Sequence, residues 1–303
     1  MPAADPKPLD QETGLLETIS SEAEAITKVL RLPFHKQVWR GQTGDFAGSG
    51  AGSSLDFQDH RAYSPGDDPR HINWQAYART GDYSMKLYRE EVRPLIDLVF
   101  DVSNSMFYDP RKRRRSLELI YFIIHSVQHS GASLTAHLVK GSHHRTMATD
   151  ALLAHAWLDH VEDFDQAPAA APPNLGAVPI RAQAMRVLVS DLLFDSPPAT
   201  TLRSLVERKG RGIIFAPFVN DEANPDWFGN YEFIDAEDQT RHPHRLEPPA
   251  LKRYLSAYKN HFALWRSQSR RFDVRLARVP SEPNFMDSLR SEALTSEAVG
   301  LWT

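Results

Sequence analysis

The stretch LIDLVFDVSNS, residues 95–105, decides the fold and carries the candidate site. Its first six residues are an apolar run of the length that predicts a buried strand. A D-x-S-x-S motif follows at once, with Asp101, Ser103 and Ser105 at every second position. One carboxylate and two hydroxyls then lie on one side of the chain as it leaves the strand. A compact group of oxygen ligands suits a hard cation such as Mg²⁺.

Strands and helices alternate around this stretch. In chain order we expect strands at 95–100, 134–139, 145–149, 185–190, 213–219 and 272–279, and helices at 114–128, 151–161, 201–209, 249–271 and 283–290. A β-hairpin is expected at 232–246, with its turn near Asp238. This alternation predicts an α/β fold with a doubly wound, mostly parallel sheet over residues 93–303, into which the hairpin is inserted at about 221–248.

A different organisation is expected for residues 1–92. We predict a tail at 1–13, a capped helix at 22–32, a Gly- and Ser-rich loop at 41–54 and a small β-rich region that includes a strand at 83–88. These 92 residues form the first of two predicted domains.

The composition excludes several classes of function. The chain has 303 residues, a formal net charge of -4 and no cysteine. A domain that binds nucleic acid is usually clearly basic, and thiolate metal sites or thiol nucleophiles need cysteine. Residues 1–12 hold no apolar signal segment, and the longest strongly apolar run, 119–124, is too short to cross a bilayer. We therefore expect a cytoplasmic protein without membrane insertion.

A second aspartate, Asp191, follows the predicted strand at 185–190. If the strand order is 3-2-1-4-5-6, the first and fourth strands are neighbours, and the winding direction reverses between them. Asp101 and Asp191 then meet at one crevice. The alternative is that both residues simply end strands and cap the turns that follow.

At this point the sequence resembles a known family. A D-x-S-x-S after the first strand and an Asp after the fourth resemble the metal-ion-dependent adhesion site (MIDAS) of von Willebrand factor A domains. Upstream, GSSLDF at 52–57, RAYSPGDD at 61–68, RHINW at 70–74 and Ala78-Arg79 look like the signature of the bacterial family called domain of unknown function 58. The similarity extends over about residues 38–290. Members of that family are von Willebrand factor A-like and are associated with MoxR-type AAA+ ATPases.

The resemblance implies a set of metal ligands. Asp101, Ser103, Ser105 and Asp191 would hold Mg²⁺, or Mn²⁺ or Ca²⁺ in its place. The family's middle loop usually supplies a threonine, but this chain has no Thr or Ser between Asp150 and Val189. Asn174 is the neutral oxygen ligand left in that segment.

The signature residues have a structural interpretation as well. PGDD at 65–68 is a strong turn signal, and Arg61, Arg70 and Arg79 can pair with Asp67 and Asp68. We expect Tyr63 and Trp74 to be local core. The basic run RKRRR at 111–115 is expected to form a solvated face. Together the structural group comprises Arg61, Tyr63, Pro65, Gly66, Asp67, Asp68, Arg70, Trp74 and Arg79.

These patterns favour a non-enzymatic, metal-dependent interaction module. The resemblance implies an adaptor or co-chaperone that works with a MoxR-type AAA+ ATPase and binds clients through an acidic side chain. One alternative is a Mg²⁺-dependent phosphohydrolase on a similar fold, although Ser103 stands where such an enzyme needs an aspartate for proton transfer. Another alternative is a structural interaction domain with a degenerate metal site.

Overall fold

The computed structural model describes residues 9–34, 55–90, 94–157, 164, 172–282 and 284–301. The chain forms two compact units, one made of residues 1–34 and 94–303 and the other of residues 35–93. The predicted loop at 41–54 and the end of the predicted helix at 151–161 lie outside the described residues.

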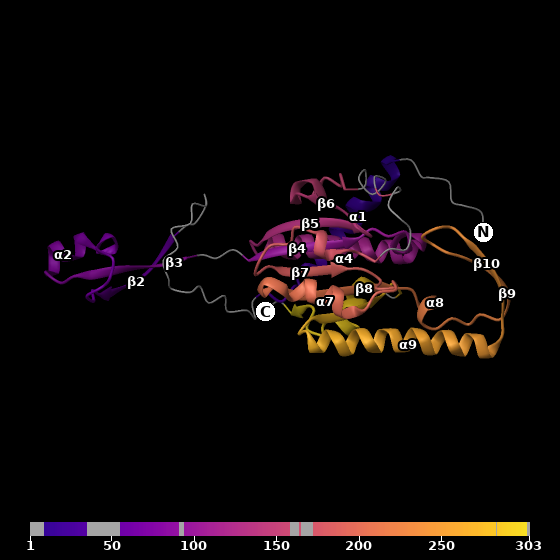
Figure 1. Ribbon diagram of the computed structural model, residues 1–303. Coiled ribbons are helices and arrows are strands. Elements are labelled where there is room, and N and C mark those ends of the chain that lie inside the picture. Colours follow the sequence, from indigo (N-terminus) through magenta and orange to yellow (C-terminus); the bar gives the residue numbers. More distant parts are fainter. Residues whose placement is uncertain are drawn as a thin grey trace. The chain divides into compact units, whose positions relative to one another are not determined.

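A six-stranded sheet is the centre of the larger unit (Figure 1). Its strand order is β11-β8-β7-β4-β5-β6, and all neighbours are parallel except the edge strand β6, which is antiparallel to β5. In chain order this is 3-2-1-4-5-6, as predicted. The strands are β4 (Leu95–Asp101), β5 (Ser133–Lys140), β6 (His143–Met147), β7 (Met185–Val189), β8 (Arg211–Phe218) and β11 (Arg275–Pro280).

Helices cover both faces of this sheet, so most residues of its inner strands are buried. On one face α4 (Pro110–His129) packs against the sheet, and α1 (Leu9–Thr27) packs on α4, together with α10 (Phe285–Ser288) and a π-helical segment, Leu289–Ala293. On the other face lie α7 (Pro198–Val206) and α9 (Pro248–Arg271). Because α4 is enclosed between the sheet and α1, most of its side chains are buried, including polar ones.

Short elements complete the larger unit. The hairpin of β9 (Gly229–Ile234) and β10 (Arg241–Leu246) was predicted correctly, and its turn lies beside the carboxyl ends of the sheet strands (Figure 1). The remaining elements are β1 (Leu30–Arg31), α3 (Ser105–Tyr108), α5 (Thr149–Leu153), η3 (Leu175–Ala177), η4 (Glu207–Lys209), α8 (Asn220–Ala223) and β12 (Gly300–Leu301).

The smaller unit is a β-hairpin with two short helices. Its elements are β2 (Leu55–Ala62), η1 (Pro69–His71), α2 (Trp74–Thr80) and β3 (Ser84–Glu90), with β2 antiparallel to β3. Arg61 donates two hydrogen bonds to Asp67, at 2.7 and 2.6 Å, and Arg70 pairs with Asp68 at 2.6 Å. Gly66 has a φ of 107°, which fits the predicted turn at 65–68.

The signature residues in this unit are therefore turn and cap residues. Asp68 caps η1, Asn73 caps α2, and Arg79 lies in the last turn of α2. Tyr63, also expected to be core, is half-buried, with its ring 6.1 Å from that of Tyr83. Trp74 was expected to be core too, but it is 57% exposed, because it begins a helix with no buried residue.

The amino-terminal helix differs from its prediction. It spans Leu9–Thr27, where we expected a tail to residue 13 and a helix at 22–32. Ser20 is not a cap but an interior residue whose hydroxyl bonds His125 Nε2 at 2.9 Å. Leu16, Ile19 and Ala23 are fully buried, so packing on α4 stabilises a helix whose local signals are weak. The structure groups α1 with the larger unit.

One buried histidine makes the stability of the sheet depend on pH. His137 of β5 is 1% exposed, and its Nδ1 bonds Thr146 Oγ1 at 3.0 Å. Burial lowers the pKa of His137 to about 4. The unfolded chain takes up this proton near pH 6.5, so the folded state loses stability as the pH falls from about 6.5 toward 4.

We expect stability to depend less on pH in His137→Gln than in wild type. The measurement is the urea midpoint of unfolding at several pH values between 4 and 7. The matched control is His143→Gln, at an exposed position of β6. An equal pH slope in wild type and His137→Gln would contradict the assignment, whatever the absolute stability of the variant.

Candidate functional site

The parallel pairing of β4 with β7 brings the two predicted aspartates together. Phe100 pairs with Val189, so both strands end at the same level. Directly beyond them, Ser190 Oγ donates a 2.6 Å hydrogen bond to Asp101 Oδ2. Asp101 and Asp191 are only 1% and 3% exposed. The predicted convergence at the switch point is therefore present in the structure, and we call this place the edge site.

The D-x-S-x-S loop turns its oxygens toward one another. Asp101 Oδ1 accepts from the backbone N–H of Ser103 at 3.0 Å. The hydroxyl oxygens of Ser103 and Ser105 lie 3.2 Å apart. Ser105 begins α3, so the loop is fixed at both ends, by the strand and by the helix. The edge site thus consists of Asp101, Ser103, Ser105 and Asp191 with the side chains that contact them.

A buried lysine stands beside the second aspartate. Lys112 Nζ lies 2.7 Å from Asp191 Oδ2 and 2.8 Å from Glu222 Oε1, and its side chain is 1% exposed. Burial alone would lower the pKa of Lys112, but the charges of Asp191 and Glu222 outweigh it and raise the pKa. Lys112 is therefore a permanent cation that ties the first turn of α4 to the end of β7 and to α8.

Lys112 also corrects the interpretation of the basic run. We expected residues 111–115 to form a solvated face, but Lys112 and Arg115 are buried. Burial of a cation is tolerated only where carboxylates pair with it, and Asp191 and Glu222 do so for Lys112.

Among the residues that the structure describes, no cation pairs with Asp101 as Lys112 does with Asp191. Burial, and then the nearby charge of Asp191, raise the pKa of Asp101 to about 7, against hydrogen bonds from Ser190 and Ser103 that lower it. Two buried carboxylates at one place are costly when both are ionised. At neutral pH the edge site therefore binds a proton readily.

A fourth carboxylate reaches the edge site from the hairpin. Glu237, in the turn between β9 and β10, accepts from the backbone N–H of Ser105 at 2.9 Å and of Asn104 at 3.2 Å. The Asn104 side chain donates to the Glu237 backbone carbonyl at 3.1 Å. Lys140, at the end of β5, donates to Asn104 Oδ1 at 2.9 Å.

The charges at the edge do not cancel. Four carboxylates (Asp101, Asp191, Glu222 and Glu237) face two ammonium groups (Lys112 and Lys140) in this network of contacts. With Asp101 ionised, the balance is four negative against two positive charges. A divalent cation is the species that such a balance attracts.

The predicted ligands fit a cation in part. Asp101, Ser103 and Ser105 present three oxygens from one loop, and each oxygen keeps a lone pair beyond the hydrogen bonds described. Asp191 differs in charge rather than in free lone pairs: Oδ2 forms an ion pair with Lys112, and Oδ1 accepts from the N–H of Leu193. Asn174 Oδ1 caps η3 by accepting from Gly176 N at 3.1 Å. In the described part of the chain, no three His, Cys, Asp or Glu side chains form a group that could hold a metal.

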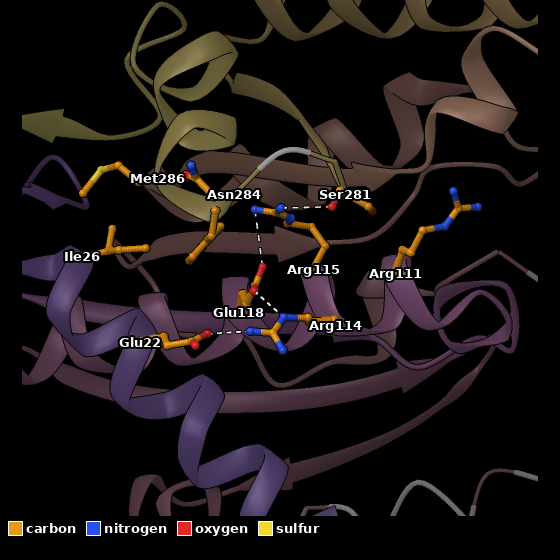
Figure 2. Close-up of a pocket in the computed structure, with 10 residues that line it drawn as sticks. Glu22, Ile26, Arg111, Arg114, Arg115, Glu118, Ser281, Asn284 and Met286 are labelled. Carbon is orange, nitrogen blue, oxygen red and sulfur yellow. Dashed lines mark hydrogen bonds and ion pairs between the residues drawn. The ribbon is translucent and has the colours of Figure 1, made fainter.

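A second polar cluster lies between α1, α4 and the segment before α10. It lines a cavity of about 440 Å³ (Figure 2). Arg114 pairs with Glu22 of α1 at 2.6 Å and with Glu118 at 2.9 Å, and Arg115 lies 3.4 Å from Glu118. Because these arginines face carboxylates, the cluster fixes α1 on α4.

Comparison with known proteins gives a family but no activity. A family described as "Protein of unknown function DUF58" matches residues 59–261, which is more than half the chain. The chain belongs to this family. No curated protein matches it.

Two solved structures resemble this DUF58 protein distantly. One is the conserved hypothetical protein BatB from Bacteroides thetaiotaomicron, with 8% identity, a TM-score of 0.35, and coverage of 67% of this chain and 98% of the other. The other is an aerotolerance-related membrane protein from Bacteroides fragilis NCTC 9343, with 12% identity, a TM-score of 0.32, and coverage of 59% and 98%. In the chain described here, none of the helices is both long and apolar enough to span a bilayer.

Sequence reasoning missed four contributors to the edge site. Ser190 directly precedes Asp191 in the sequence, so its position at the strand end could have been predicted together with that of Asp191. Lys112 belongs to a run of five basic residues, 111–115. Only the helical spacing of α4 separates the members of this run that point inward from those that point to solvent. Glu222 and Glu237 come from distant segments, and their positions depend on how α8 and the hairpin fold back.

We expect Lys112→Met to destabilise the protein by about 3–5 kcal/mol, because it leaves the buried Asp191 and the partly buried Glu222 without their cation. Urea unfolding measures this loss. Lys259→Met, at an exposed position of α9, is the matched control. Adding Glu222→Gln to Lys112→Met should restore part of the stability, since one uncompensated charge is removed. Equal urea midpoints for Lys112→Met and Lys259→Met would show that the Lys112 ion pairs do not stabilise the fold.

Proposed function

We propose that this DUF58 protein is a non-enzymatic, metal-dependent protein–protein interaction module that works in the cytoplasm. Its docking point is the edge site. The observation that carries the proposal is the arrangement of Asp101, Ser103 and Ser105 on one loop at the switch point, with two hydroxyl oxygens 3.2 Å apart. In open α/β sheets this edge is where ligands bind.

Mg²⁺, or Mn²⁺ or Ca²⁺, suits these oxygens and the surplus of negative charge around them. Asp101, Ser103 and Ser105 would hold it, with Asp191 beside them in its ion pair with Lys112 and Asn174 on η3. When bound, such a cation supplies a position for the carboxylate of another protein. The protein's own residues hold the loop in shape: Ser190 orients Asp101, and the N–H of Ser103 fixes the turn.

A MoxR-type AAA+ ATPase is the proposed partner, and unknown client proteins would dock through an acidic side chain. This part of the proposal comes from the resemblance to the family and its von Willebrand factor A-like relatives. An adaptor or co-chaperone of this type needs a surface that recognises carboxylates, and a cation at the edge site would supply it. It needs no chemistry at Asp101.

One observation favours the alternative of a Mg²⁺-dependent phosphohydrolase. The sequence offered no lysine in the expected loop, whereas the structure places Lys112 against Asp191. Ser103 still stands where a general acid and base is required, and a hydroxyl cannot fill that role near neutral pH. Hydrolysis of p-nitrophenyl phosphate by purified wild type, lost in Asp101→Asn, would favour the enzyme over the interaction module.

We expect calorimetric titration with Mn²⁺ to show one site per chain, weakened at least about tenfold by Asp101→Asn or Ser103→Ala. The first variant removes the one negative charge among the three proposed ligands, and the second removes a ligand oxygen. Asp195→Asn, an exposed aspartate on the loop after β7, should bind like wild type. If titration detects no specific Mn²⁺ binding to wild type, the protein is instead a structural interaction domain with a degenerate metal site.

A further inference from the structure

The β9–β10 hairpin places a carboxylate of this chain at its own docking point. Among the described strands, those of the hairpin pair with each other and with no further strand, from Gly229 with Leu246 to Ile234 with Arg241. The base of the hairpin is anchored by Trp227, whose ring lies 5.6 Å from that of Tyr254 on α9. The turn, residues 235–239, reaches the D-x-S-x-S loop through Glu237 and Asn104.

The turn is shaped by its own side chains. Asp235 Oδ1 accepts from the N–H of Glu237 at 2.7 Å, and Asp238 Oδ1 accepts from the N–H of Thr240 at 2.8 Å. Gln239 takes a positive φ of 61°, and its N–H bonds the carbonyl of Asp235. These local bonds keep the turn in shape without help from the edge site. Glu237 is thus presented on a preformed acidic turn.

The contact of the hairpin tip with the edge site is small by comparison. It consists of two hydrogen bonds to the Glu237 carboxylate and one to its backbone carbonyl. Most of the hairpin is exposed, especially β10. Loss of three hydrogen bonds would therefore free the tip while leaving the turn and the base of the hairpin intact.

We propose that Glu237 is an internal acidic ligand, which covers the edge site in the free protein and is replaced there by the carboxylate of a partner. This inference rests on the proposed function. The carboxylate of Glu237 lies on the N–H groups of the very loop that carries Ser103 and Ser105, so a second carboxylate cannot approach that loop without meeting its charge. The partner segment that fits is an acidic turn like 235–239.

Tethering explains why the internal ligand prevails in the free protein. A side chain held on the same chain acts at an effective concentration of about millimolar, so an isolated acidic peptide has to compete with it. A true partner must bring further contacts or must release the hairpin. The edge site is then selective for proteins that do more than present one carboxylate.

The internal contact is tested by amide hydrogen exchange of the full chain. In Glu237→Ala we expect the amides of Asn104 and Ser105 to exchange about tenfold faster or more, because they lose their acceptor. The matched control is Glu232→Ala on β9, which removes only a surface pair with Arg241. Unchanged exchange at both amides in Glu237→Ala would overturn the inference.

Replacement by a partner is tested with a cyclic peptide of residues 233–241 (FIDAEDQTR), added in the presence of Mn²⁺. We expect the peptide to bind Glu237→Ala at least about tenfold more tightly than wild type or Glu232→Ala. A peptide that carries the substitution Glu237→Gln should lose this binding. Equal binding to all three proteins would show that Glu237 does not cover the site. Faster amide exchange without peptide binding would retain the internal contact, but would overturn acidic docking and with it the proposed function.

Discussion

The pairing of β4 with β7 is the constraint on which the edge site depends. Because the two strands are parallel and end at the same level, Asp101 and Asp191 leave the sheet side by side in a buried place. Two carboxylates there oppose folding unless something offsets their charge. Lys112 offsets Asp191, and hydrogen bonds from Ser190 and Ser103 offset only part of the cost at Asp101.

The position of α4 follows from the same need. A lysine near a helix amino terminus opposes the helix dipole, and burying it adds a cost of desolvation. Both costs are met because the Lys112 ammonium touches two carboxylates, one from the end of β7 and one from α8. Asp109 caps the same helix end by accepting from the N–H of Arg111. The site and the packing of α4 are therefore one electrostatic arrangement, and neither can change alone.

The sheet could be predicted from the sequence because its signals are local and repeated. Apolar runs such as 95–100 and 185–189 mark buried strands, and the handedness of parallel connections limits their order to a few arrangements. α1 could not be delimited in this way, since its length depends on packing against α4. The D-x-S-x-S loop was likewise local, whereas the Glu237 contact joins segments more than a hundred residues apart. Nothing in the chain around 237 distinguishes that glutamate from a solvated turn residue.

Lys112 and Glu237 have different effects on the proposed cation site. Lys112 is fixed, fully buried and paired twice, so Asp191 is neutralised whether or not a cation is bound. What remains for a cation is Asp101 with two hydroxyls, a set too poor in charge to hold it tightly. A further carboxylate completes such a set, and that of Glu237 already lies on the N–H groups of the same loop. Cation binding and acidic docking would then strengthen each other, and the hairpin would decide which carboxylate, the chain's own or a partner's, completes the site.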